Sequence, residues 1–286
     1  MNAVFSQRTR HIAFALAGIL TFVVLAGVTY QSVATALERR QFTHPGRLID
    51  VGGHQLHIYC LGEGAPTVVL EAPAAGISVG WALVQDDLGK TTRVCSYDRA
   101  GLGWSESGDA GYRAARVPDE LHTLLERSGE RGPFVIGGHE LGAAFARMYA
   151  ARFPAQTAAL VLIDDLSETP DSAPVISRLV RAWPWLARVG LLRATRALSR
   201  HAAGVPDTRG GATRAFLNRP DHLTRASMEI ATLRETVSLA SAPLDPSLPV
   251  IRVTTNPEEP PALLDSAVRA RDVTRALETA VKRVRR

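Results

Sequence analysis

The stretch FVIGGHELG, residues 134–142, decides the fold class of this 286-residue chain. Its first four residues are apolar or small, as in a buried strand, and apolar residues continue at helical spacing after position 140. Gly138 and Gly142 flank Glu140, and glycine permits the sharp turn that so short a connection needs. The stretch therefore predicts a strand, a tight turn and a helix, with the Glu140 side chain held at the end of the strand.

Strands and helices alternate on both sides of this unit. The expected strands are 47–51, 55–60, 67–71, 93–97, 134–137 and 159–164, and the expected helices are 81–88, 117–127 and 141–152. Such alternation indicates right-handed βαβ units, a mostly parallel sheet and helices on both of its faces. The fully apolar run at 159–163 fits a strand that is covered on both faces. The predicted fold class is α/β.

The pattern changes after the strand at 159–164. Residues 167–245 are helical in pattern and rich in arginine, a strand is expected again at 248–254, and a final helix at 263–286. A helical insertion between two strands of a sheet is typical of a lid or cap. The predicted division is an N-terminal segment (1–40), a core (41–166 and 246–286) and a helical cap (167–245).

The N-terminal segment is strongly apolar. Residues 12–37 carry no charge, and about 20 apolar helical residues span a bilayer. We predict a transmembrane helix with a short cytoplasmic tip and the folded domain on the secreted or periplasmic side. Arg8 and Arg10 precede the run and basic residues also follow it, so the positive-inside rule gives little direction. A cleaved signal peptide ending near Ala34-Thr35-Ala36 is the alternative, which the length of the apolar run disfavours.

Composition narrows the choice of partners. The formal net charge of +5 is compatible with an anionic membrane surface, so membrane lipid is the expected partner of the N-terminal helix. The sequence has no basic run interleaved with aromatic residues, no zinc-ligand spacing and no phosphate-binding glycine pattern. We therefore expect no nucleic acid, no metal and no cofactor. The two cysteines, Cys60 and Cys95, are expected to be buried free thiols.

The turn at residues 138–142 has the spacing of the nucleophile elbow G-x-S-x-G, with Glu140 at the position of the serine. Together with GRLIDVGG (46–53) and TRVCSYDRAGLGWS (92–105), it resembles bacterial membrane-anchored members of the α/β-hydrolase superfamily. The resemblance implies the α/β-hydrolase fold. It also places the strand of Cys60 beside that of Cys95, but a disulfide would need an oxidising compartment, and free thiols remain the expectation.

The resemblance also implies positions for the parts of a hydrolase site. Glu140 takes the nucleophile position, Glu258 the acid position and Asp164 an alternative acid position. Ala72 and Leu141 take the oxyanion positions, beside His139. Pro73 has no N–H to donate in the oxyanion loop, and the last histidine of the chain, His222, falls in the cap instead of the family's C-terminal histidine loop.

These departures favour a degenerate hydrolase that binds a small apolar ligand or a partner. The alternative is an active hydrolase of esters or epoxides with Glu140 as nucleophile, because relatives with this fold use a carboxylate there. The ester that Glu140 would form needs a histidine-activated water for its hydrolysis. We further expect the Glu140 carboxylate to accept the unpaired N–H groups of the following helix. Trp183 and Trp185, set among arginines, either contact anionic lipid or pack over the old pocket.

Overall fold

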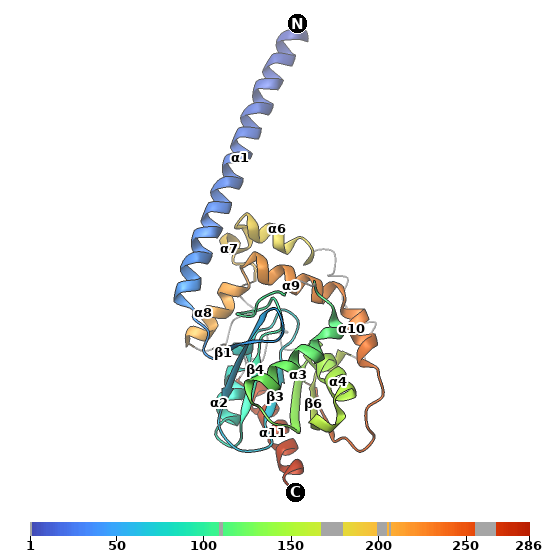
Figure 1. Ribbon diagram of the computed structural model, residues 1–286. Coiled ribbons are helices and arrows are strands. Elements are labelled where there is room, and N and C mark those ends of the chain that lie inside the picture. The colour runs from blue at the N-terminus through green and yellow to red at the C-terminus, as the bar shows by residue number, and fades with distance from the viewer. Residues whose placement is uncertain (1, 109–110, 167–179, 199–204, 206, 255–266) are drawn as a thin grey trace.

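The structure is a computed structural model that describes residues 2–108, 111–166, 180–198, 205, 207–254 and 267–286 (Figure 1). Its strands are β1 (Arg47–Asp50), β2 (Gln55–Leu61), β3 (Val68–Glu71), β4 (Val94–Tyr97), β5 (Phe134–His139), β6 (Thr157–Ile163) and β7 (Val250–Val253). They form one sheet in the order β1-β2-β4-β3-β5-β6-β7. β1 and β2 are antiparallel to their neighbours, and β4, β3, β5, β6 and β7 run parallel. The predicted α/β class with a mostly parallel sheet is confirmed.

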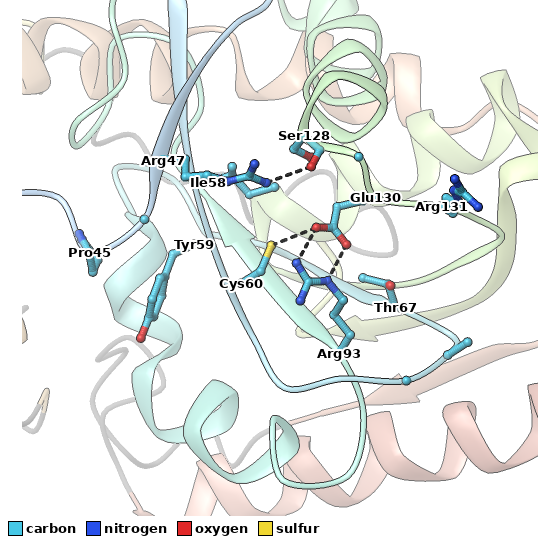
Figure 2. Close-up of a pocket in the computed structure, with 14 residues that line it drawn as sticks. Pro45, Arg47, Ile58, Tyr59, Cys60, Thr67, Arg93, Ser128, Glu130 and Arg131 are labelled. Carbon is cyan, nitrogen blue, oxygen red and sulfur yellow. Dashed lines mark hydrogen bonds and ion pairs between the residues drawn. The ribbon is translucent and has the colours of Figure 1, made fainter.

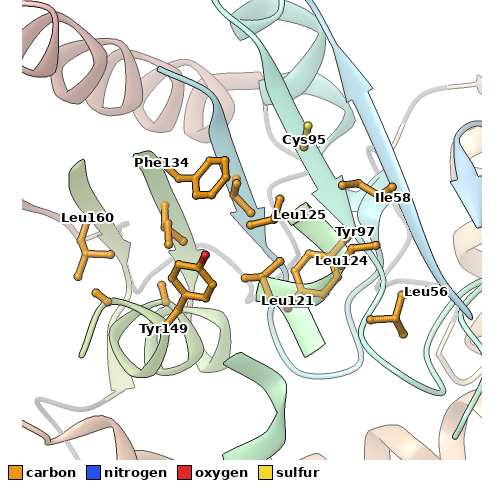
Figure 3. Packing of buried hydrophobic residues seen from close by; sticks show 14 of the residues in the cluster. Leu56, Ile58, Cys95, Tyr97, Leu121, Leu124, Leu125, Phe134, Tyr149 and Leu160 are labelled. Carbon is orange, nitrogen blue, oxygen red and sulfur yellow. The ribbon is translucent and has the colours of Figure 1, made fainter. Parts of the chain in front are cut away.

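Helices cover both faces of this sheet, as predicted. The core helices are α2 (Ala82–Leu88), α3 (Val117–Ser128), α4 (Leu141–Arg152) and α11 (Ala267–Val284). On one face, Leu121 and Leu125 of α3 and Tyr149 of α4 pack against strand residues (Figure 3). On the other face, Leu88 of α2 and Leu277 of α11 do the same. Each fully buried side chain of this size contributes about 1.5–3 kcal/mol of stability, so the two apolar layers fix the sheet.

The two cysteines form a disulfide, so the expectation of free thiols is wrong. β2 and β4 pair antiparallel with Cys60 directly opposite Cys95, which brings their Cα atoms to 4.0 Å. Directly opposed residues of an antiparallel pair have their side chains on the same face, within reach of each other. The strand register, which the sequence leaves open, therefore decides the state of the thiols.

Between β6 and β7 the described elements are all helical: α6 (Trp183–Arg188), α7 (Leu191–Thr195), α8 (Asp207–Phe216), α9 (Pro220–Ala231) and α10 (Leu233–Ala240). They lie over the carboxyl ends of the parallel strands (Figure 1). The N-terminal helix α1 (Asn2–Gln41) is 40 residues long, about 60 Å at 1.5 Å per residue. It projects away from the sheet past α6 and α7, and it is long and apolar enough to cross a membrane.

Candidate functional site

The turn between β5 and α4, residues 138–142, is as sharp as its glycines predict. Glu140 has φ 50° and ψ −113°, in a region that side-chain-bearing residues rarely adopt. A Cβ on Gly138 would lie 2.4 Å from the carbonyl oxygen of Gly142, and a Cβ on Gly142 would lie 2.4 Å from that of Glu71. Only glycine fits at either position, so these two residues hold Glu140 in a strained backbone at the carboxyl end of the sheet.

The Glu140 side chain does not cap the helix that it precedes. Glu140 is half-buried and makes no side-chain capping hydrogen bond to α4, so the expected capping role is wrong. A capping residue normally has extended backbone angles, from which its side chain reaches back to the second or third N–H of the helix. The positive φ of Glu140 departs from that geometry. The backbone N–H of Glu140 donates instead to the carbonyl of Ile163 in β6, at 2.8 Å.

His139 is turned toward the neighbouring strand. Its Nε2 lies 3.4 Å from Oδ2 of Asp164, at the end of β6, and its ring meets that of Trp81 edge-on. His139 is buried and Asp164 half-buried. The structure thus brings together His139, Glu140 and Asp164, which the sequence had proposed for one site. Among the interactions described, however, the imidazole is directed to the aspartate and not to Glu140.

Arg99 holds the loop that follows β3 in place through hydrogen bonds to its backbone. Its guanidinium donates to the carbonyls of Ala72, at 2.7 Å, and Pro73, at 2.9 Å. Ala72 is buried, and so is Leu141, the other residue at an expected oxyanion position. The hydrogen bonds from Arg99 to two consecutive carbonyls therefore fix the position of this loop, and the rigid ring of Pro73 limits its conformation further.

Arg99 belongs to a buried ionic network that joins the core to the cap, formed with Glu71 of β3 and Glu229 of α9. The guanidinium binds both carboxylate oxygens of Glu229, at 2.8 and 2.9 Å, and one oxygen of Glu71, at 3.3 Å. With the two loop carbonyls, these contacts use all five of its N–H donors. The Tyr97 hydroxyl donates to the other oxygen of Glu71. The space between sheet and cap is filled here by charged groups that satisfy one another.

Burial and charge oppose each other in this network. Burial raises the pKa of Glu71 to about 7, although Arg99 and the Tyr97 hydroxyl favour its charged form. Burial alone would lower the pKa of Arg99, but Glu229 and Glu71 raise it above its ordinary value. At neutral pH, Arg99 is therefore positively charged. The carboxylate of Glu229 neutralises this charge, and Arg99 also binds Glu71, which is partly protonated.

Two further side chains of α9 attach the cap to the core. The N–H of Gly103 donates to Nδ1 of His222, at 3.2 Å, and Nε2 of His222 lies 3.1 Å from the carbonyl of Ala75. These contacts require a neutral imidazole with its proton on Nε2, and burial lowers the pKa of His222 to about 4. Arg225 donates to the carbonyl of Ser107 and stacks over Tyr112. His222, Arg225 and Glu229 repeat at spacings of three and four, so one face of α9 is polar and turned inward.

The family comparison agrees with this architecture. Residues 66–200 match the family model described as "alpha/beta hydrolase fold". Cfl2 from Burkholderia cenocepacia superposes with a TM-score of 0.63 at 21% identity, covering 82% of this chain and 95% of that one. The chain has the α/β-hydrolase fold.

Curated relatives add less about activity. A 2-hydroxymuconate semialdehyde hydrolase of Pseudomonas sp. (strain CF600) is 29% identical over 142 residues, which is 48% of both chains. An uncharacterised vacuolar membrane protein of Saccharomyces cerevisiae (strain YJM789) is 30% identical over 117 residues, 35% of this chain and 18% of that protein. The chain spans less than half the length of these curated relatives. The apolar helix α1 and a membrane-protein relative together support a membrane location.

A serine, a histidine and an aspartate also meet elsewhere in this chain. His57 Nδ1 lies 3.0 Å from Oδ2 of Asp98 and 3.3 Å from Oγ of Ser78, and all three side chains are buried. In a catalytic triad the two nitrogens divide the work, one facing the acid and the other the nucleophile. Here both partners contact the same nitrogen. Asp98 also accepts the N–H groups of Ser78 and Trp104, so the cluster holds the turn after β4 in place.

The larger of two described pockets is a groove of about 770 Å³ at the opposite edge of the sheet (Figure 2). It lies at the amino ends of β3 and β5, whereas ligands of open α/β sheets bind at the carboxyl ends. Arg93 and Glu130 form a bidentate ion pair across it, beside the Cys60–Cys95 disulfide. Neither Glu140 nor His139 lines this groove, so it is separate from the hydrolase site.

The second pocket, of about 380 Å³, lies between the turn after β4 and the start of α9. Arg39, Glu106, Arg219 and Asp221 give it charged walls.

Sequence reasoning missed part of this site. Glu258, the expected acid, lies outside the described residues. Glu71 and Glu229 were not singled out, and Arg99 entered only as part of the stretch 92–105 that carries the family resemblance. The only available signal was the spacing of His222, Arg225 and Glu229 along one helix face.

Proposed function

We propose that this protein is a membrane-tethered member of the superfamily that has lost hydrolytic turnover and acts by binding a partner. The observation that carries the proposal is the Arg99–Glu71–Glu229 network. It fills the junction of sheet and cap with mutually satisfied charges and draws the two consecutive carbonyls of the oxyanion loop onto Arg99. A substrate carbonyl would need a free N–H from this loop, and Pro73 has none.

The hydrolase site also lacks a base aimed at Glu140 among the described residues. His139 is directed at Asp164, His222 is held neutral between Gly103 and Ala75, and His57 is enclosed with Asp98. Each imidazole therefore already has a structural partner. Without an activated water, an ester formed on Glu140 would persist.

The partner is more readily a protein than the small apolar ligand expected from the sequence. Both described pockets have walls with arginine and glutamate side chains. An apolar ligand would displace water from these charged groups and offer them no hydrogen bonds in return, which is unfavourable. The Cys60–Cys95 disulfide supports a domain on the oxidising side of the membrane, since disulfides persist there.

One observation favours the alternative, an active hydrolase of esters or epoxides with Glu140 as nucleophile. The backbone at Glu140 keeps a strained φ of 50°, although the nucleophilic serine has been replaced by glutamate. Such backbone strain is concentrated at functional sites. We propose that residues 138–142 are the family's nucleophile elbow, and the experiment below decides whether it still reacts.

The test uses the full chain in detergent micelles with a panel of short acyl esters and epoxides, beside Glu140→Ala and Glu140→Gln. Product formation is followed together with the intact mass of the protein, which detects an ester trapped on Glu140. We expect neither turnover nor adduct in any of the three proteins. Turnover, or an adduct with the mass of a whole epoxide or of an acyl group, that is present in the wild type and absent from both variants would refute the proposal.

A further inference from the structure

The N-terminal helix α1 does more than tether the domain, because its second half is docked on the cap. A Cβ on Gly27 would lie 2.2 Å from the carbonyl oxygen of Val189, in the loop between α6 and α7. The two backbones are therefore in direct contact. Gly190, in the same loop, faces Gly27 in return, with its Cβ position 2.9 Å from the Gly27 carbonyl oxygen.

Polar contacts continue this interface toward the end of α1. Gln31 is only 3% exposed; it donates to the carbonyl of Asn218, at 2.7 Å, and accepts from Nε of Arg193, at 3.0 Å. Arg193 also binds both carboxylate oxygens of Glu38. A buried amide and a bidentate ion pair are specific in geometry. They fix the height and the rotation of the cap relative to α1.

The length of the same helix relates the cap to the bilayer that α1 is proposed to span. Its large apolar side chains are exposed from Ile12 onward, and its hydroxyl groups are satisfied internally: Thr21 and Thr29 each donate to the carbonyl four residues earlier. Counting the roughly 20 residues that span a bilayer from Ile12 ends near Gln31. With α1 in a bilayer over these residues, the Gly27–Val189 contact, four residues before Gln31, would place the α6–α7 loop near the boundary between hydrocarbon and headgroups.

The cap surface at that height has the composition of a membrane interface. Trp185 is 69% exposed and Leu191 is 47% exposed, and the Arg188 guanidinium lies 4.8 Å from the centre of the Trp185 ring. Residues 180–198 contain four arginines and no acidic residue. Only Arg193 has a carboxylate partner among the described contacts. Of the two arrangements expected from the sequence, inward packing holds for Trp183 but not for Trp185.

We propose that the surface formed by Arg181, Trp185, Arg188, Leu191 and Arg196, hereafter the α6–α7 face, lies in the headgroup layer of the membrane that α1 spans and binds anionic lipid there. Tryptophan and leucine enter the acyl boundary, and the three arginines contact lipid phosphates. α6 and α7, which carry this surface, lie on the side of the domain nearest the N-terminal end of α1 (Figure 1). The inference rests on the membrane tether of the proposed function and is independent of catalysis.

Depth is tested with the full chain reconstituted in vesicles that contain lipids brominated near the headgroup end of the acyl chain. Co-flotation with the vesicles first establishes that α1 is inserted. Trp185→Phe and Trp183→Phe are compared with the wild type for quenching of tryptophan fluorescence. We expect the lipid-quenched fraction to disappear in Trp185→Phe and to persist in Trp183→Phe. Equal quenching in Trp185→Phe and the wild type would overturn the placement, and failure to co-float would overturn the tether as well.

Lipid choice is tested by energy transfer from tryptophan to dansyl-labelled phosphatidylserine and dansyl-labelled phosphatidylcholine in the same vesicles. The triple variant Arg181→Gln/Arg188→Gln/Arg196→Gln is matched by Arg275→Gln/Arg283→Gln/Arg286→Gln on and after α11, which removes equal charge from the far end of the domain. We expect the wild type and the α11 triple to favour the anionic probe, and the cap triple to lose that preference, with each arginine contributing up to about fivefold in affinity. An unchanged preference in the cap triple would overturn the role of the arginines.

Discussion

Glu229→Gln should loosen the cap from the core by disrupting the ionic network. The substitution keeps the size of the side chain and removes the carboxylate that binds Arg99 at 2.8 and 2.9 Å. Removing one partner of a buried ion pair costs about 3–5 kcal/mol, because the remaining charge stays buried. Glu71 is still available to Arg99 at 3.3 Å, so we expect the lower end of that range, about 3 kcal/mol.

That loss corresponds to a melting temperature lowered by roughly 6–12 °C for a domain of this size. The assay is thermal unfolding of the full chain in detergent micelles at pH 7, followed by near-ultraviolet circular dichroism. Glu235→Gln on α10 is the matched control, since Glu235 is exposed and should change stability by less than about 0.5 kcal/mol. Equal melting temperatures for the two variants would show that the network does not hold the cap.

The same variant should also change how the stability of the folded state depends on pH. The pKa of Glu71 is about 7 in the folded protein, above its ordinary value of 4.5, so the folded state binds the proton more tightly. The contribution of Glu71 to stability is therefore complete below pH 4.5 and is lost as the pH rises to about 7. Glu229 helps to raise this pKa, so Glu229→Gln should flatten the dependence in that window. A slope as steep as that of the wild type would contradict the coupling.

Three further outcomes are expected. Gly142→Ala should cost more than about 2 kcal/mol because its Cβ would lie 2.4 Å from a backbone oxygen, whereas Gly80→Ala, with nothing within 4 Å, should be close to neutral in urea titrations. His222 has a folded pKa of about 4, below its ordinary 6.5, so its contribution to stability is lost as the pH falls from about 6.5 to 4, and His222→Gln should show a shallower loss in that range. Reducing the Cys60–Cys95 disulfide, which closes a segment with a sequence separation of 35, should destabilise the domain by about 3–4 kcal/mol; an unchanged urea midpoint with dithiothreitol would count against a structural bond.

The sequence by itself determined the local structure of this protein. Alternating strand and helix patterns predicted the sheet and its covering helices, because buried strands and amphipathic helices have different periods. Gly138 and Gly142 predicted the sharp turn at Glu140, because glycine permits the backbone angles that so short a connection needs. The apolar run from residue 12 predicted the long N-terminal helix for the same local reason.

Only the tertiary structure decided which distant groups meet. Cys60 and Cys95 are bonded because of the β2–β4 register, and Arg99 is neutralised by a carboxylate 130 residues away, on α9. The helical capping role expected of Glu140 failed because the backbone angles of the turn depart from those of a capping residue. These outcomes depend on the three-dimensional positions of elements that are remote in sequence. Periodicity in the sequence shows which face of a helix or strand is buried, but it does not show which charged group from a distant element packs against that face.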